Sequence, residues 1–335
     1  MKNVFKYEGR IAVIKLVSAV AAVALLAGGA SAQEIKIRFA HSLSATEPAH
    51  TAAEFFAKNV KERSKGRVQI DVFPGEQLGS GKDINEMIRQ GANVMNITDP
   101  GYLSDFVPDM GVLNGPYVVK DQKEFSKLLA SDWYKGVDQK LQQAGFRLVM
   151  VGGFFGARHM IADRPIRKPE DLQGLTVRVP PNTMWIETFK ALGARGTTVQ
   201  WSEIYNALQQ NVVVAAEAPY GSLYGSKLHE VRKFISKTGH FTAIVAWPIN
   251  AGFFNRLPKD VQDMLLEEGA KARDEMTRLT LALEDDYVGK FKAAGVTIVT
   301  DVDVPAFQKA TAPVYSAFPK WTPGLHQTVT KVLAN

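Results

Sequence analysis

The chain of 335 residues contains no cysteine, which excludes a disulfide framework, a lipid-attachment site and any zinc site built from thiolates. Its six histidines are scattered, and none belongs to a His-Glu-x-x-His pattern, so a catalytic zinc site is not expected either. Glycine-rich dinucleotide fingerprints are also missing. We therefore expect the protein to need no cofactor and no metal.

The stretches that come nearest to enzyme motifs fail in their spacing. Residues 75–82 resemble a phosphate-binding loop, but the first glycine comes one residue too early and Asp83 stands where serine or threonine is needed. Residues 221–225 carry two glycines and a serine in the wrong arrangement for a nucleophile elbow. The sequence therefore predicts a protein that is not an enzyme, and a periplasmic enzyme acting on a small carboxylate is kept as the alternative.

Charge of one sign is not concentrated anywhere in the chain. The formal net charge is +6, and residues 1–32 contribute four basic side chains and one acidic one, so the remainder is near +3. Its basic residues are dispersed among acidic ones without a stripe or run, which argues against nucleic acid as a partner.

The first 32 residues have the pattern of a cleaved signal peptide. Four basic residues accompany an apolar run at 16–27, and residues 30–32 (Ala-Ser-Ala) fit a small-residue cleavage site. The apolar run is too short for a comfortable membrane span, and no stop-transfer segment follows it. We expect a protein exported to the periplasm without a direct membrane anchor.

Strands and helices alternate along the rest of the chain, which predicts an α/β fold with mostly parallel sheets. Apolar residues alternate at 35–39 and 68–72, as in strands, and recur at helical spacing at 52–60 and 84–88. Residues 147–151 and 241–247 are also expected to form strands. Residues 223–235 also fit a helix, and the helical pattern from 257 to 293 is long enough to brace two domains. We expect domain I at 33–155 and 244–283, and domain II at 156–243 and 284–335.

Polar residues occur where four of the predicted strands end, namely Ser42, Asp99, Arg178 and Glu217. Ligand sites in α/β folds lie beyond the carboxyl ends of strands, so this placement predicts a cleft. Arg178 alternates with Val177 and Val179 and must point away from the face that they bury. Its guanidinium either pairs with an acid of the chain, such as Glu203 or Glu217, or receives a carboxylate from outside.

Several longer motifs resemble those of the DctP-type substrate-binding proteins of tripartite ATP-independent periplasmic (TRAP) transporters. The stretch Lys168-Pro-Glu-Asp-Leu-Gln-Gly-Leu-Thr-Val-Arg-Val-Pro180 is the hallmark, and Arg158 precedes it at the spacing seen in the family. Matching motifs lie at 73–79, 192–194, 202–209, 217–219, 227–231 and 238–240. The resemblance covers the whole chain after the predicted signal peptide.

The resemblance implies a type II-like, two-domain periplasmic binding protein with a long helix bridging its domains. Such a receptor closes on an organic acid and delivers it to a small and a large membrane subunit. It implies that Arg178 clamps the ligand carboxylate and that Arg158 assists, with pairing at the domain interface as the alternative role of Arg158. The further ligand-binding positions that we predict are Trp201, Asn182, Asp99, Tyr102, Ser42, His41 and Ala218.

Some positions depart from the family pattern. Ala218 replaces an asparagine that touches the ligand in many members, and Tyr102 stands where sialate-binding relatives have a further arginine. Together with Trp201, these residues make the pocket less suited to a polyhydroxylated sugar acid. The candidate ligands are C4-dicarboxylates, 2-oxo or hydroxy acids and aromatic acids, with sugar acids less favoured. We expect a monomer, and service to a different transporter or a sensor is a second alternative.

Overall fold

The computed structural model describes residues 34–334, so the predicted signal peptide lies outside the described residues. Residues 36–335 form one compact unit, and the description below concerns this unit. None of the described helices combines the length and the apolar character that crossing a membrane requires.

The first sheet has three strands in the order β2 (Val68–Phe73), β1 (Ile35–Ala40), β3 (Val94–Asn96). β1 and β3 are parallel, as predicted, and helices α2 (Pro48–Arg63) and α3 (Gly81–Arg89) connect the strands. α2 begins with a proline in its first turn, where no backbone donor is lost. α3 begins with a capping box formed by Ser80 and Asp83.

The second sheet has six strands in the order β6 (Arg195–Thr198), β5 (Thr176–Val179), β7 (Ala215–Ala218), β4 (Phe146–Ala162), β8 (Phe234–Asn250), β9 (Thr297–Val299). β5 is parallel to both β6 and β7, and β8 is parallel to β9. β4 is antiparallel to β7 and β8. The prediction of mostly parallel strands therefore describes the edges of this sheet and is wrong for its centre.

β4 and β8 are much longer than the sequence patterns indicated. Each has 17 residues, and the two pair along nearly their whole length. We expected β4 to end before Gly152, but Gly152 has a φ of 87° and lies at one of four register shifts in the pair. A β-bulge accommodates such a glycine and bends the ribbon without ending it. The helix predicted at 223–235 is replaced by the short helices α8 (Tyr220–Gly225) and α9 (Leu228–Val231).

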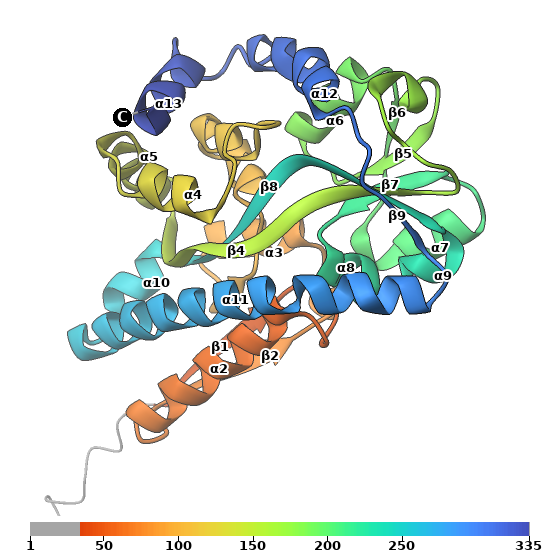
Figure 1. Ribbon diagram of the computed structural model, residues 1–335. Helices are drawn as coiled ribbons and strands as arrows, with labels where there is room; N and C mark the ends of the chain where they lie inside the picture. The colour runs from red at the N-terminus through yellow and green to blue at the C-terminus, as the bar shows by residue number, and fades with distance from the viewer. Residues whose placement is uncertain (1–33, 335) are drawn as a thin grey trace, which may run out of the picture. The chain divides into compact units, whose positions relative to one another are not determined.

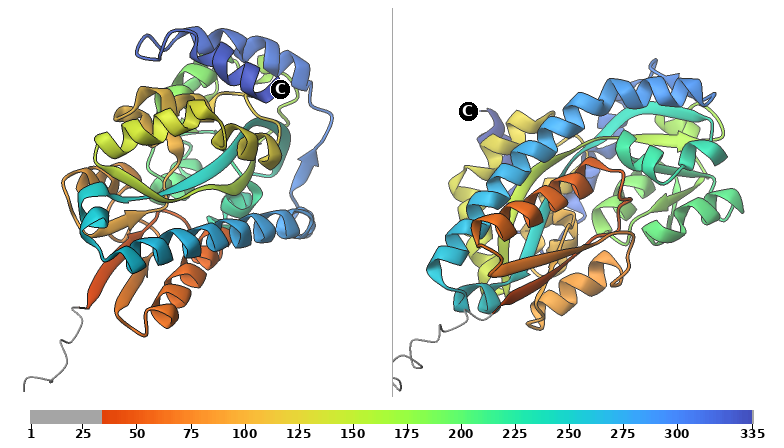
Figure 2. Two further views of the ribbon diagram at one scale, coloured as in Figure 1. Left: turned by 90° about the vertical axis from the view of Figure 1, so that its left-hand side faces the viewer. Right: turned by 90° about the horizontal axis from the view of Figure 1, so that it is seen from below.

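The long helix α11 (Lys259–Ala293) has 35 residues and confirms the predicted bridging helix. It lies alongside α2, which connects two strands of the first sheet, and it crosses β4 of the second sheet. Its far end contacts α8 and β9 on the side of the second sheet (Figures 1 and 2). Gly269 allows the close approach to β4, because a Cβ atom there would lie 2.4 Å from the carbonyl oxygen of Val149. The helix therefore spans both halves of the fold.

Separate hydrophobic clusters fill the two halves. One contains the start of β4 and the end of β8 with α4 (Gln122–Leu129), α5 (Asp132–Gln143) and α13 (Leu325–Ala334). Another lies among β5, α6 (Thr183–Ala191) and α12 (Val304–Thr311), and a third lies under α7 (Ile204–Gln209). α13 thus packs with the first half, whereas our predicted boundary assigns it to domain II, and the boundaries stay a prediction.

The remaining helical segments are short. They are α10 (Ala251–Arg256) and the 3-10 helices η1 (Pro100–Asp105), η2 (Pro108–Asn114), η3 (Pro169–Leu172), η4 (Trp201–Glu203) and η5 (Ala312–Ser316).

Candidate functional site

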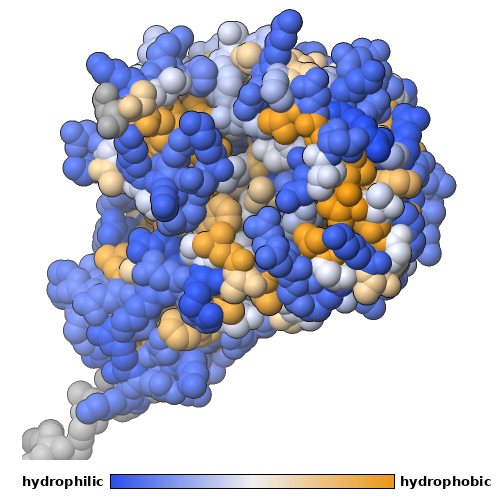
Figure 3. Space-filling model, viewed as in Figure 1, coloured by the Kyte–Doolittle hydropathy of each residue, from blue (hydrophilic) through white to orange (hydrophobic). Residues whose placement is uncertain are grey.

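A pocket lies where the two sheets face each other, and its space between atoms, including the open mouth, is about 720 Å³. Most of the surface shown in Figure 3 is hydrophilic, and hydrophobic residues appear in separate patches, in the middle of that face and to the right of it. The lining comes from both halves of the fold: Ser42, Leu43, Gly81, Ile97, Thr98, Asp99, Tyr102, Phe155, Arg158, Arg178, Pro180, Asn182, Trp185, Trp201, Ala218, Ser222 and Val245.

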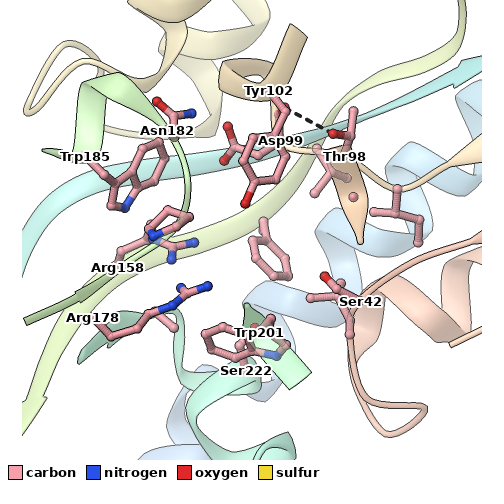
Figure 4. Close-up of a pocket in the computed structure, with 17 residues that line it drawn as sticks. Ser42, Thr98, Asp99, Tyr102, Arg158, Arg178, Asn182, Trp185, Trp201 and Ser222 are labelled. Carbon is pink, nitrogen blue, oxygen red and sulfur yellow. Dashed lines mark hydrogen bonds between the residues drawn. The ribbon is translucent and has the colours of Figure 1, made fainter. Parts of the chain in front are cut away.

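Arg178 projects from β5 into this pocket (Figure 4). Its neighbours Val177 and Val179 are buried in the core on the other side of the strand, as the alternation predicts. Its Nε donates to the carbonyl oxygen of Val199 at 2.9 Å, and its guanidinium lies 5.1 Å from the centre of the Trp201 ring. No carboxylate of residues 34–334 forms an ion pair with it. Burial, together with the charge of Arg158, lowers the pKa of Arg178 to about 10.

Arg158 is the second cation of the pocket, and its charge is already neutralised. Its Nε and one terminal nitrogen contact the two carboxylate oxygens of Glu217 at 2.6 and 2.8 Å, which is a bidentate ion pair. The antiparallel register of β4 and β7 brings the two residues together, because Met160 lies opposite Glu217. Arg158 is thus paired with an acid of the neighbouring strand of its own sheet, which is not the pairing at the domain interface that we gave as its alternative role. It also lines the pocket, and its part in ligand binding stays a prediction.

Glu217 is completely buried and is held by two further side chains. The indole nitrogen of Trp185 donates to one carboxylate oxygen at 2.9 Å, and Nε2 of His240 lies 3.3 Å from the other. Burial is the main reason that the pKa of His240 is lowered, and its Nε2 contacts the carboxylate without the geometry of a hydrogen bond. Burial alone would raise the pKa of Glu217, but the charge and hydrogen bonds of Arg158 outweigh it and lower the pKa to about 2.

The opposite wall of the pocket carries Asp99 and Tyr102 (Figure 4). Asp99 caps η1, because its Oδ1 accepts a hydrogen bond from the backbone of Gly101 at 2.8 Å and its Oδ2 accepts one from Asn114 at 3.2 Å. It is thus a helix cap as well as a lining residue. Burial raises the pKa of Tyr102 to about 12, so its hydroxyl stays protonated and can donate.

Asn182 and Trp201 supply hydrogen-bond donors that have no partner among the described residues. These are the amide nitrogen of Asn182 and the indole nitrogen of Trp201, both buried. The other amide atom of Asn182, its oxygen, caps α6 by accepting from Met184 at 2.9 Å. A buried donor without a partner costs about 1–3 kcal/mol, so both groups would gain from an acceptor in the pocket.

Gly101 shows how closely the two walls approach each other. A Cβ atom at this position would lie 2.1 Å from the amide nitrogen of Asn182, which belongs to the second sheet's side of the fold. Ser202 and Glu76 form a hydrogen bond across the same gap. The described conformation is therefore one in which the two walls touch.

Glu47 forms another contact between the two halves, beside the pocket. Its Oε2 lies 2.5 Å from the hydroxyl of Ser222, a lining residue, and its Oε1 accepts from the backbone of Ser44 at 2.9 Å. Burial raises the pKa of Glu47 to about 7. Folding therefore favours the protonated form of Glu47. The stability that this form provides is fully present below the unfolded-state pKa near 4.5, and it is lost as the pH rises through about 7.

Glu47→Gln should remove this pH dependence, because an amide cannot ionise. The free energy of unfolding of the variant relative to the wild type should rise by about 3 kcal/mol between pH 4.5 and 7.5 and stay level above that. Denaturant unfolding at a series of pH values measures the difference. Glu54→Gln, which changes an exposed residue of α2, should show no such trend. A constant difference across this range would contradict the assignment to Glu47.

The pocket contains eight of the nine residues predicted to bind the ligand. The exception is His41, which is buried but does not line the pocket, because its ring accepts from the backbone of Leu43 at 3.1 Å and lies 3.0 Å from His50. Whether the eight bind a ligand stays a prediction. Sequence reasoning missed Thr98, Phe155, Trp185 and Ser222 as lining residues, and it did not assign Glu217 as the partner of Arg158.

Residues 34–334 contain no group of three or more histidine, aspartate or glutamate side chains placed to hold a metal ion.

The sequence matches the family described as bacterial extracellular solute-binding protein, family 7, over residues 39–320. The chain belongs to this family. Among its relatives, the 2,3-diketo-L-gulonate-binding periplasmic protein of Escherichia coli K12 is 29% identical, with 82% of this chain and 84% of the relative covered. The sialic acid-binding periplasmic protein of Vibrio cholerae is 27% identical, with 91% and 94% covered.

Solved structures of TRAP periplasmic solute-binding proteins share the fold. One from Ochrobacterium anthropi with bound L-fuconate is 35% identical and superposes with a TM-score of 0.86, with 90% of this chain and 99% of that chain covered. One from Actinobacillus succinogenes 130z with bound L-galactonate is 33% identical, with a TM-score of 0.87 and coverage of 89% and 99%. The fold is thus the two-domain α/β fold of TRAP solute-binding proteins, with α11 as the bridging helix.

Proposed function

We propose that this protein is a periplasmic receptor that binds an organic acid through Arg178 and delivers it to the membrane subunits of a TRAP transporter. The observation that carries this proposal is the guanidinium of Arg178, which faces the pocket without an ion-pair partner among the described residues. A buried cation without a partner is costly, and a ligand carboxylate offers two parallel hydrogen bonds that would offset this cost.

The polar lining favours an acid that also carries hydroxyl groups. Ser42, Thr98, Asp99 and Ser222 offer acceptors and donors around the space beside Arg178 (Figure 4). The relatives with bound L-fuconate and L-galactonate point to the same class. This differs from our expectation that sugar acids are less suited, which weighed Trp201, Ala218 and Tyr102 and did not include Thr98 or Ser222.

The proposal assigns binding without catalysis to this pocket. No group of three or more histidine, aspartate or glutamate side chains placed to hold a metal ion lies among the described residues, and Glu217 is fully engaged by Arg158. Turnover of a tightly bound acid by the purified protein would instead favour the enzyme alternative.

Delivery requires two partners, a small and a large membrane subunit, and we propose that a monomer serves them. We also propose that residues 1–32 direct export and are then removed. Closure of the two domains around the acid would create the surface that the membrane subunits recognise, with α11 and the β4–β8 pair as the connections between the domains.

A thermal-shift screen against a library of organic acids tests the receptor function. A ligand present at 100 times its dissociation constant stabilises the protein by about 2.7 kcal/mol, which raises the melting temperature by on the order of 5 °C. We expect hydroxylated carboxylates to give such shifts and their amides or methyl esters to give none. A protein that no acid of the library stabilises would contradict the proposal.

A further inference from the structure

Three charged side chains line the pocket, namely Asp99, Arg158 and Arg178. The bidentate pair with Glu217 neutralises Arg158. Arg178 and Asp99 therefore remain as one available cation and one available anion. An acid that enters the pocket finds a single unpaired positive charge.

No cationic side chain among residues 34–334 lies at hydrogen-bonding distance from Asp99. Its two oxygens accept from neutral donors, the backbone of Gly101 and the amide of Asn114. The rest of its surface is turned to the pocket, so an approaching ligand group meets a carboxylate. Lys82, whose Nζ lies 6.0 Å from the centre of the Tyr102 ring, is partly exposed and already paired with Asp105 at 2.7 Å.

A second carboxylate on the ligand would therefore face Asp99 without a counter-ion. Like charges placed side by side in a desolvated site cost several kcal/mol. A hydroxyl in the same place would instead donate to Asp99, and its oxygen could accept from the unpartnered amide of Asn182, which lies on the same side of the pocket. We infer, given the receptor function proposed above, that Asp99 restricts the ligand to a hydroxylated monocarboxylate and rejects dicarboxylates.

The titration of Asp99 supports the same limit. Burial is the main reason that the pKa of Asp99 is raised to about 6; Glu217 also raises it, whereas Gly101, Arg158 and Asn114 lower it. A dicarboxylate could be accommodated if Asp99 took up a proton, and at pH 8, the pH of the comparison below, this uptake would weaken its binding about 100-fold.

Two probes that differ in one carboxylate test the inference. L-galactonate and galactarate share a six-carbon chain with four internal hydroxyls, but galactarate carries a carboxylate at both ends; glycerate and tartronate are a shorter pair of the same kind. Isothermal titration calorimetry at pH 8 gives the affinity of each for the wild type and for Asp99→Asn. Asparagine retains the cap of η1 and removes only the charge. Asp285→Asn, which changes an exposed residue of α11, is the matched control.

We expect the wild type to bind the monocarboxylate of a pair at least 100-fold more tightly than the dicarboxylate. Asp99→Asn should reduce this ratio at least tenfold, and Asp285→Asn should leave it unchanged within twofold. A wild-type ratio below tenfold, or an unchanged ratio in a folded Asp99→Asn protein, would overturn the inference. If the acid library yields only dicarboxylates, the inference is wrong and the receptor function stands, whereas a library without any ligand refutes both.

Discussion

Arg178→Ala should weaken binding of the cognate acid by roughly a hundred- to several-thousand-fold, because removing one partner of a desolvated charge pair costs about 3–5 kcal/mol. Arg178→Lys should recover part of this loss, since it keeps the charge but lacks the planar fork. Calorimetric titration with the best acid of the thermal-shift screen measures the affinities. Arg195→Ala, an exposed residue of the neighbouring strand β6, is the control and should bind like the wild type.

The same variant distinguishes a ligand clamp from a structural ion pair. Arg178 has no carboxylate partner among the described residues, so its removal should leave the melting temperature of the ligand-free protein unchanged or raise it. A marked loss of stability without any loss of affinity would show that Arg178 supports the fold and does not bind the acid.

Glu217→Gln should lower the free energy of unfolding by about 3–5 kcal/mol, because it leaves the buried guanidinium of Arg158 without its counter-ion. The double variant Arg158→Met/Glu217→Gln should regain much of this loss, since no charge then remains buried. Urea unfolding measures both. If the double variant is no more stable than Glu217→Gln alone, the ion pair is not the source of the effect.

The pH dependence of this difference follows from the lowered pKa of Glu217. The unfolded-state pKa is near 4.5 and the folded-state pKa is about 2, so the stability that the carboxylate provides is fully present above 4.5. It is lost as the pH falls toward 2. The gap between wild type and Glu217→Gln should therefore be constant from pH 5 to 7 and narrow below pH 4.5.

Local sequence spacing was enough to predict the features that depend on neighbours in the chain. The alternation around Arg178 predicted its direction, and the helical period from 257 to 293 predicted α11 within two residues. The extent of β4 was missed because Gly152 fits both a strand end and a bulge, and only pairing with β8 decides between them.

The pairing inside the pocket depends on tertiary contacts and was not predictable from spacing. The sequence analysis named Glu217 as a possible partner of Arg178, whereas the register of β4 against β7 places it beside Arg158. The lining residues Thr98, Phe155, Trp185 and Ser222 come from segments separated by tens of residues. Family motifs found most of the pocket, because they record which distant positions meet.

The interleaved path of the chain has a consequence for gene truncation. β4, β8 and α11 each pass from one half of the fold to the other, and α13, at the end of the described chain, packs with residues of α4. A stop codon placed anywhere before residue 259 therefore removes α11, which packs against both halves, and leaves neither half complete. We therefore expect a stop codon before residue 259 to abolish binding, and not to yield a half-receptor that captures the acid and withholds it from the transporter.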